Sequence, residues 1–369
     1  MRVLRLLRQV LYVILMTLSV CQLLLLFRLL GQLEVEVVDV SQSHGWGRPT
    51  TLPGPSVSSN AGRPASNASP GDPVQPESGS WDSLGCASRI IYPDNFTTER
   101  TSRSIDRFMV MSGPGRLGNK MFRYASLIGI AHRNGYESYV FDKDLLVRVF
   151  KISHVRPYED YDLPELGEHS SSQYDNCLEI LPRNQSYRLV GYYQSWRYFK
   201  NVESEVKWEF RFQDDIMQQV RKFFDSSRFR NRTTVGVHVR LGDMTSKVAR
   251  RQGYTVASKE YLLRAMAYFR KRYFDALFVV CSNEVGWTKK NIVGGDIVYH
   301  HKDAFTDIAV LANCQHSIIS TGTYGWWAAW LAGGETIYYS NFPAKNTWLR
   351  SQYKKEDYFP PSWIGMGDE

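Results

Sequence analysis

The chain has 369 residues, of which 43% are hydrophobic and 14% aromatic, enough apolar material for a sizeable core and for more than one domain. Its 45 lysines and arginines outnumber its 37 acidic residues, which gives a net charge of +8. A basic balance is the usual first sign of nucleic-acid binding, but no basic run here is interleaved with aromatic residues. We therefore expect no nucleic-acid partner, and small anionic substrates and acidic membrane lipid account for the excess charge.

The first predicted element is a hydrophobic span near the N-terminus. Residues 10–27 carry no charge, and as a helix they would extend about 27 Å, close to the thickness of a bilayer's hydrocarbon core. A cleaved signal peptide is the alternative, but the apolar stretch is long for one and no small-residue cleavage site follows. Three arginines precede the span, and Glu34 and Glu36 follow it. We therefore predict a cytoplasmic tail (1–9), an uncleaved membrane anchor (10–30) and a lumenal remainder.

Residues 31–104 are predicted to form a flexible stem, because they are rich in proline, glycine and serine and offer little to bury. Four N-x-S/T sequons begin at Asn67, Asn95, Asn184 and Asn231. Such sequons are used only in a lumenal or secreted protein, so they agree with the predicted anchor.

The cysteines predict structural roles. Cys21 lies in the apolar span, which leaves four in the lumenal part: Cys86, Cys177, Cys281 and Cys314. Four cysteines permit three disulfide pairings, and the sequence does not choose among them. Their spacing is not that of a metal site, and no nearby histidine completes a zinc set. We expect disulfides or buried thiols, without a metal.

The folded region is predicted to begin near residue 105, with a strand over 107–113. A glycine-rich turn follows, and Asn119 could cap a helix that ends at Gly135. A strand, a glycine loop and a helix together offer backbone N–H groups to an anion, with Arg116 and Asn119 as side-chain contributors. No nucleotide fingerprint accompanies the loop, so it does not by itself establish a binding site.

Two further stretches of this region carry alternative interpretations. Asp142 and Asp144 form a D-x-D pair, which in a transferase can hold a divalent metal; the start of a helix with acidic residues in its first turn is the favoured alternative. Residues 188–199 gather aromatic side chains, which we expect in the core, with a sugar-stacking wall as the alternative.

The stretch 234–243, TVGVHVRLGD, predicts a buried strand that turns polar at its end. His238 and Arg240 stand there, and Gly242 and Asp243 form a turn. Open α/β sheets bind ligands at the carboxyl edge of their strands, and the planar guanidinium of Arg240 suits a phosphate. The alternative is an Arg240–Asp243 surface ion pair that closes the turn.

The remainder of the chain alternates regularly. Helices are expected over 259–273, 285–292 and 305–313, and again after residue 325; strands are expected over 276–281, 297–299, 316–320 and 336–339. This alternation predicts an α/β domain with a parallel, doubly wound sheet. The turn 321–325 follows a strand and opens a helix, so its hydroxyl and N–H groups suit a phosphate. An ordinary βα turn is the alternative.

Together, these segments resemble the galactoside α-1,2-fucosyltransferases, the inverting enzymes that move fucose from GDP-fucose to terminal galactose. The matching blocks span essentially everything after the predicted stem: 115–127, 189–199, 237–243, 278–283, 307–334 and 358–366. The block over 307–334 is highly specific, whereas HVRxGD alone is a moderate signal. The order of anchor, stem and catalytic region is also that of Golgi glycosyltransferases.

The resemblance implies a GT-B-like fold of two Rossmann-like lobes with parallel sheets, over residues 105–230 and 231–369, in a type II Golgi membrane protein. GDP-fucose would be bound mainly by the second lobe, and a galactose-terminated glycan would accept the fucose. No metal and no other cofactor is implied, because a cation and a nest of backbone N–H groups take the place of the metal.

The resemblance also implies the roles of individual residues. Arg240 would bind the β-phosphate and stabilise the departing GDP, an effect of roughly 3–4 kcal/mol for a fixed donor at a developing charge. His238 would position the nucleotide, and Asp307 would accept hydrogen bonds from guanine. The diphosphate would be held by Thr321, Gly322 and Thr323. Arg116 and Asn119 of the first glycine loop would close over the donor.

One residue departs from the family pattern. The strand-end motif usually carries two arginines, and Leu241 occupies the second position. This leaves room for a chain that binds nucleotide sugar or glycan without turnover, although the intact Arg240 favours an enzyme. The base that takes the proton of the galactose hydroxyl is Asp243 in our hypothesis. A fucosyltransferase with another acceptor is the other alternative, and dimerisation through the anchor or stem stays open.

Overall fold

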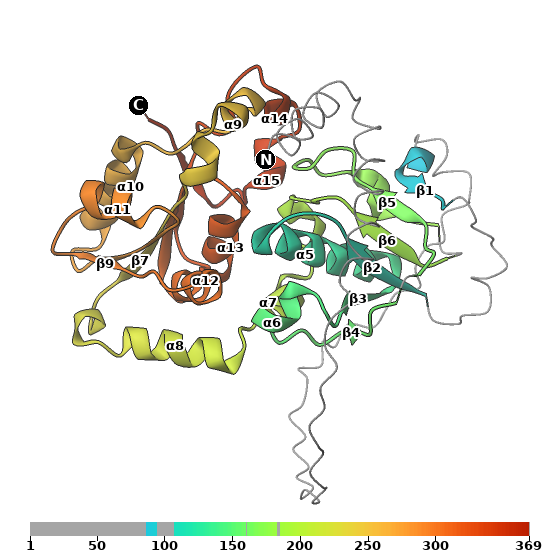
Figure 1. Ribbon diagram of the computed structural model, residues 1–369, viewed down its shortest axis with the longest axis horizontal. Helices are drawn as coiled ribbons and strands as arrows, with labels where there is room; N and C mark the ends of the chain where they lie inside the picture. The colour runs from blue at the N-terminus through green and yellow to red at the C-terminus, as the bar shows by residue number, and fades with distance from the viewer. Residues whose placement is uncertain (1–85, 94–106, 160, 183–184, 369) are drawn as a thin grey trace, which may run out of the picture. The chain divides into compact units, whose positions relative to one another are not determined.

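The computed structural model describes residues 86–93, 107–159, 161–182 and 185–368 (Figure 1). The predicted tail, anchor and most of the stem lie outside the described residues, as do three of the four sequons, at Asn67, Asn95 and Asn184. The described part of the chain contains no helix with the length and hydrophobicity needed to cross a membrane. The fourth sequon residue, Asn231, is exposed in a turn before β7.

The first lobe is built on a six-stranded sheet in the order β1-β5-β6-β2-β3-β4. Its strands are β1 (Ile90–Ile91), β2 (Phe108–Ser112), β3 (Glu137–Phe141), β4 (Val155–Arg156), β5 (Glu165–Gly167) and β6 (Tyr187–Val190). All neighbouring strands run parallel except β1, which is antiparallel to β5. Strand order reverses between β2 and β6, and open α/β sheets bind ligands beside the carboxyl ends of two such strands.

The helices of the first lobe follow local sequence signals. Helix α5 (Leu117–Asn134) packs on β2 and β3, and it ends because Gly135 adopts a left-handed conformation with φ of 69°. Asp144 begins α6 (Leu145–Val149) by accepting a hydrogen bond from the Leu146 N–H at 2.9 Å. The other helical segments are η1 (Cys86–Arg89), η2 (Asn176–Glu179), η3 (Trp196–Tyr198) and α7 (Glu203–Glu209).

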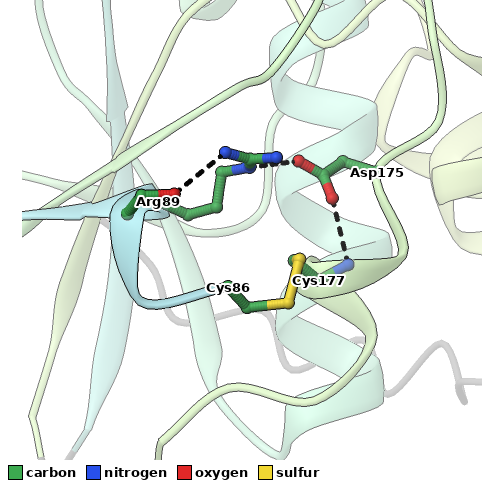
Figure 2. Close-up of a disulfide and its surroundings, with 5 residues drawn as sticks. Cys86, Arg89, Asp175 and Cys177 are labelled. Carbon is green, nitrogen blue, oxygen red and sulfur yellow. Dashed lines mark hydrogen bonds and ion pairs between the residues drawn. A yellow bond between two sulfur atoms is a disulfide. The ribbon is translucent and has the colours of Figure 1, made fainter. Parts of the chain in front are cut away.

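A disulfide extends the first lobe toward the N-terminus. Cys86 is bonded to Cys177 across a sequence separation of 91 residues (Figure 2). Beside it, Arg89 forms an ion pair of 2.5 Å with Asp175, whose other carboxylate oxygen accepts from the Cys177 N–H at 3.1 Å. The folded lobe therefore includes η1 and β1, which we had assigned to the stem, because tertiary contacts hold a segment that is too short to show a strand pattern. Cys281 and Cys314 are buried free thiols.

The second lobe is built on a six-stranded sheet that is parallel throughout, in the order β12-β11-β10-β7-β8-β9. Its strands are β7 (Thr234–Val239), β8 (Leu277–Ser282), β9 (Ile297–Tyr299), β10 (His316–Ile319), β11 (Thr336–Tyr339) and β12 (Ile364–Met366). This is the predicted doubly wound α/β arrangement. The strand order reverses between β7 and β10, so the two strands whose ends carry the predicted phosphate-binding residues lie side by side.

The helices of the second lobe alternate with its strands as predicted. They are α8 (Asp214–Phe224), η4 (Ser227–Phe229), η5 (Gly242–Thr245), α9 (Lys247–Gln252), α10 (Lys259–Arg272), α11 (Val285–Asn291), α12 (Ala304–Ala312), α13 (Thr323–Ala332), α14 (Trp348–Ser351) and α15 (Lys355–Tyr358). Helix α8 packs against α12, so the second lobe begins before residue 231, the predicted boundary. Buried Ile216 and Val220 make that contact face apolar.

The two lobes share one aromatic core. Helices α5 and α13 pack against each other between the two sheets (Figure 1). Phe122 of α5 contacts Trp326 of α13 at a centroid distance of 4.5 Å, and Phe199 stacks on Trp327 at 5.5 Å. The aromatic stretch 188–199 thus contributes to the core, as expected, because Phe199 is fully buried. This shared core fixes the amino ends of α5 and α13 close together.

Candidate functional site

Arg240 stands at the carboxyl end of β7, where the strand order reverses. Its backbone N–H donates to the Ser320 hydroxyl at the end of β10 (2.8 Å). The guanidinium lies against Gly322, where a Cβ atom would be only 3.1 Å from Nη1 and where φ is +97°. Glycine is therefore required at position 322, both for its backbone conformation and for the close approach of the arginine.

His238, two residues earlier in β7, is buried and neutral. Its ring lies 5.1 Å from that of Tyr324, and a Cβ atom at Gly325 would come within 2.4 Å of Nδ1. Burial, with a smaller contribution from the charge of Arg240, lowers the pKa of His238 to about 3. Nδ1 has no hydrogen-bond partner among the described residues. A buried polar atom without a partner is costly, so its presence at the end of β7 calls for a functional explanation.

The loop after β10 provides backbone and hydroxyl groups beside the guanidinium. Thr321 precedes Gly322, the first residue before α13, and Thr323 opens the helix. The Thr321 hydroxyl is buried without a partner among the described residues. Free N–H groups in the first turn of a helix attract an anion. The strand-end guanidinium, the hydroxyl and the helix N-terminus together form a site suited to a diphosphate.

Asn119 connects this loop to the first lobe. Its side-chain oxygen accepts from the Thr323 hydroxyl at 2.8 Å and from the Gln194 amide at 3.3 Å. The preceding Gly118 lies so close to α13 that a Cβ atom there would be 2.7 Å from the backbone carbon of Thr323. Three segments far apart in the sequence therefore meet at Asn119: the glycine loop, the turn after β6 and the start of α13.

Arg123 connects the glycine loop to the turn after β6, a role that was not predicted from the sequence. Its side chain is 1% exposed and donates to three backbone carbonyls: Gly191 at 2.6 Å, Pro114 at 2.8 Å and Gly113 at 3.2 Å. It thus ties the glycine loop after β2 to the turn after β6. A single cation in an otherwise apolar helix face was the only sequence signal for this role.

Glu168, which follows β5, organises the same turn. Its two carboxylate oxygens accept from the backbone N–H groups of Tyr192 (2.7 Å) and Tyr193 (2.5 Å). Burial raises the pKa of Glu168, although these hydrogen bonds and the charge of Arg123 oppose the rise. The carboxylate is thus a structural acceptor for the turn that carries Gln194.

Asp307 lies in the first turn of α12 and is 8% exposed. Its Oδ1 accepts from the Lys302 N–H at 3.0 Å and lies 2.8 Å from Nδ1 of His300. Its Oδ2 lies 3.9 Å from Nδ1 of His301. Oδ1 is therefore held by two short contacts within the protein, and Oδ2 by one longer contact with His301.

Asp243 pairs with Arg240 through a contact of 2.9 Å between Oδ2 and Nη2. Burial would raise the pKa of Asp243, but the hydrogen bond and charge of Arg240, together with the charge of Arg116, hold it below its ordinary value. Arg116, exposed in the glycine loop of the first lobe, thus acts electrostatically on the strand-end turn of the second. The Arg240–Asp243 ion pair, which was the alternative interpretation of the sequence, is therefore present. It lies within the predicted phosphate-binding site.

Leu241 packs into the second lobe. The side chain is 8% exposed and belongs to the apolar cluster that includes Val239 and Tyr261. Its backbone N–H donates to the Asn283 side chain at 3.0 Å. The position at which a second arginine was expected is therefore occupied by a core side chain.

The D-x-D pair precedes α6, so a helix begins where the favoured interpretation expected it, but neither aspartate lies in the first turn of that helix. Asp142 accepts from the Tyr158 N–H at 3.2 Å. Asp144 caps α6 and forms an ion pair of 2.6 Å with Lys120. Both carboxylates are thus engaged in local structure.

With this geometry established, similarity to known proteins identifies the family. The chain matches the family model described as Glycosyl transferase family 11 over residues 90–367. This chain belongs to glycosyl transferase family 11. The match covers both lobes and begins at β1, in agreement with the extended first lobe.

Curated relatives of this family 11 chain carry the name that the sequence resemblance suggested. Galactoside alpha-(1,2)-fucosyltransferase 1 from Bos taurus is 32% identical over 302 residues, which cover 76% of this chain and 82% of the relative. The protein of the same name from Sus scrofa is 34% identical over 271 residues (68% and 73%). Galactoside alpha-(1,2)-fucosyltransferase 2 from Sus scrofa is 32% identical over 284 residues (73% and 83%).

Solved fucosyltransferases are more distant from this family 11 chain. NodZ alpha-1,6-fucosyltransferase soaked with GDP-fucose gives a TM-score of 0.43 at 14% identity, covering 60% of this chain and 92% of NodZ. A point mutant of Arabidopsis thaliana FUT1 in complex with GDP gives 0.46 at 10% identity, covering 72% and 75%. Likeness at this level carries no site geometry from either structure to this chain.

Proposed function

We propose that this chain is an inverting galactoside 2-α-L-fucosyltransferase, which moves L-fucose from GDP-fucose to the 2-hydroxyl of a terminal β-galactose. The names of its family 11 relatives support the activity. The observation that carries the proposal is the arrangement at the carboxyl ends of β7 and β10. A guanidinium, a helix N-terminus and two buried polar atoms without a partner among the described residues lie there, on Arg240, Thr321 and His238.

The donor diphosphate binds between Arg240 and the start of α13 in this proposal. Thr321 supplies a hydroxyl, while Gly322 and Thr323 supply backbone N–H groups. The neutral His238 contributes a hydrogen bond, because its low pKa keeps the imidazole uncharged. Oδ2 of Asp307, the oxygen not held by Lys302 and His300, accepts from the N–H edge of guanine. Asn119 closes the site from the first lobe through its hydrogen bond to Thr323.

Departure of GDP places negative charge on the β-phosphate, and Arg240 stabilises that charge. A donor fixed in advance at a developing charge contributes roughly 3–4 kcal/mol. Leu241 supplies no second cation, because its side chain is in the core. Arg116 is our candidate for the second cation, since its charge already acts on Asp243 next to Arg240. No metal takes part in this mechanism.

Asp243 is our candidate for the base that receives the galactose hydroxyl proton. It is ionised at neutral pH, but its lowered pKa makes it a weak base. Proton transfer then comes late, once bond formation to the sugar has made the hydroxyl acidic. Replacement by asparagine should reduce turnover about 10²-fold or more. Near-normal turnover of Asp243→Asn at every pH would eliminate Asp243 as the base.

We further propose that the chain is a single-pass Golgi membrane protein whose GT-B-like catalytic region faces the lumen. This placement rests on the apolar span over 10–27, the proline-rich stem and the sequons. The two Rossmann-like sheets with their ligand-binding edges near the shared core support the GT-B-like assignment. Protease protection of the catalytic region in intact vesicles tests the orientation: cleavage of that region without detergent would contradict it.

The activity is tested by the structure of the product. The full chain is incubated with GDP-fucose and a panel of glycans that includes lactose, and the linkage is determined by NMR. We expect fucose α-linked to O2 of the terminal β-galactose. Fucose on another sugar, or on a protein hydroxyl, would mean a different acceptor. Tight GDP-fucose binding with no product from any acceptor would identify an inactive homologue, for which the buried Leu241 is the structural argument.

A further inference from the structure

A thiol, an imidazole and a carboxylate gather next to the predicted guanine site. Each of Cys281, His300 and Asp307 offers one ligand atom, and these atoms lie within 4.8 Å of one another. Within the described ranges, no other three histidine, cysteine or acidic side chains come together in this way. The three come from separate elements: the end of β8, the residue after β9 and the first turn of α12.

The existing contacts already orient two of these groups toward each other. Nδ1 of His300 lies 2.8 Å from Oδ1 of Asp307, and the Cys281 thiol lies 3.9 Å from the Asp307 backbone carbonyl. Cys281 and Asp307 are buried and His300 is half-buried. The edge of Phe223 packs on the His300 ring, with 4.7 Å between centroids, so the imidazole has little freedom to turn away.

These ligand types and separations suit a borderline-soft divalent cation. Zinc takes cysteine sulfur, histidine nitrogen and carboxylate oxygen at about 2.0–2.3 Å in a tetrahedron, which places the ligand atoms roughly 3.3–3.6 Å apart. Separations of at most 4.8 Å therefore need shifts of about 1 Å. Three protein ligands leave a fourth position for water.

We propose that Cys281, His300 and Asp307 bind Zn²⁺ or a cation of similar softness, and that the bound metal excludes the donor nucleotide. The exclusion rests on the proposed function, in which Asp307 accepts from guanine. A metal held by the Asp307 carboxylate neutralises its negative charge, including the charge on the Oδ2 that guanine would approach, so each ligand weakens the binding of the other.

Binding displaces one proton from the thiol, and no electron is transferred. The metal replaces the proton of the Cys281 thiol, and that proton leaves to solvent.

Cys314 provides a matched control. It is the other buried free thiol of the described chain, and it donates to the Val310 carbonyl at 3.5 Å. It does not belong to the group of metal-ligating side chains. Cys281→Ser and Cys314→Ser therefore make the same chemical change in the same lobe, and only the first removes a proposed ligand.

Cobalt is the first probe, because a thiolate bound to Co²⁺ gives a charge-transfer absorption band that needs no enzyme activity. The full-length wild type and Cys314→Ser should develop this band with one equivalent of Co²⁺ and lose it when Zn²⁺ is added. Cys281→Ser should lack the band, while its cooperative thermal unfolding shows that it is folded. An equal band in Cys281→Ser, or none in the wild type, would overturn the metal site.

Competition with GDP then tests the exclusion. We expect saturating Zn²⁺ to weaken GDP binding at least tenfold in the wild type and in Cys314→Ser, and less than twofold in Cys281→Ser. Equal GDP affinity with and without Zn²⁺ would overturn the exclusion while leaving the metal site standing. A chain that gives the cobalt band but never binds GDP would instead contradict the proposed function.

Discussion

At the scale of single residues, the site depends on groups whose ordinary chemistry is changed by their surroundings. His238 lies inside the lobe, where its imidazole stays neutral, and Gly325 is required beside it because any Cβ atom there would come within 2.4 Å of Nδ1. Asp243 is ionised but held below its ordinary pKa by Arg240 and Arg116. Leu241 packs into the apolar cluster of the second lobe.

The buried imidazole predicts an acid-dependent loss of stability. The pKa of His238 falls from 6.5 in the unfolded chain to about 3 in the folded one. Its contribution is therefore complete above pH 6.5 and is lost as the pH falls toward 3, because only the unfolded chain then takes up the proton. Between pH 7 and pH 5, this group should lower the free energy of unfolding by about 2 kcal/mol.

Denaturant unfolding of the wild type and of His238→Gln at both pH values measures the contribution of His238 to the free energy of unfolding. The difference between the two proteins isolates His238, because the other titrating groups are common to both. We expect the wild type to lose about 2 kcal/mol more than the variant on acidification. Equal losses in the two proteins would contradict a buried, neutral His238.

At the scale of elements, two loops and one helix are coupled by Arg123. A lysine at this position cannot reach the carbonyls of Gly113, Pro114 and Gly191 together, so Arg123→Lys leaves buried acceptors unpaired. We expect a loss of roughly 2–4 kcal/mol in the free energy of unfolding. Because the glycine loop carries Arg116 and leads into the first turn of α5, where Asn119 lies, the KM for GDP-fucose should also rise at temperatures where the variant is folded.

Arg133→Lys is the control on the same helix. Arg133 is half-buried, and it pairs with Glu179 at 3.0 Å and with the Tyr174 hydroxyl. Such a pair contributes at most about 1 kcal/mol. Chemical denaturation and steady-state kinetics compare the two variants, and an unchanged KM in folded Arg123→Lys would show that Arg123 supports only the fold.

The disulfide also connects separate elements of the first lobe. It closes a segment of 91 residues and holds η1 and β1 on the first sheet. Removal of a natural disulfide typically costs 2–5 kcal/mol, so Cys86→Ser, Cys177→Ser and the double variant should each lose roughly this amount. A fragment that begins near residue 104 should be destabilised likewise, because it lacks Cys86. Thermal unfolding without reductant measures the effect, and a double variant as stable as the wild type would contradict it.

At the scale of the whole molecule, the sequence predicted the second lobe well and the first lobe less fully. The strands β7 and β8 and the helix α10 between them carry strong periodic signals. The polar residues at the ends of β7 and β10 come together because parallel strands end at one edge. Strands β1, β4 and β12 have two or three residues each, too few for any pattern. They form only because neighbouring strands pair with them.

The contacts that complete the site were beyond local sequence signals. Arg123 reaches a carbonyl 68 residues away, and Thr323 donates to Asn119 across 204 residues. The choice among three disulfide pairings and the position of α8 on α12 also depend on how the lobes fold. Family resemblance supplied roles for Asp307 and His238, whereas the buried environment that makes His238 neutral required the structure.

The central claim is that Arg240 at the end of β7 drives departure of GDP during transfer to a galactoside. The direct measurement is lactose-dependent GDP release from GDP-fucose by the full chain, with Arg240→Ala compared with Arg221→Ala, which removes an exposed arginine of α8. We predict that Arg240→Ala loses about 10²–10³-fold in rate, with its cooperative unfolding retained, while Arg221→Ala keeps wild-type turnover. Turnover by folded Arg240→Ala within tenfold of the wild type would contradict the account.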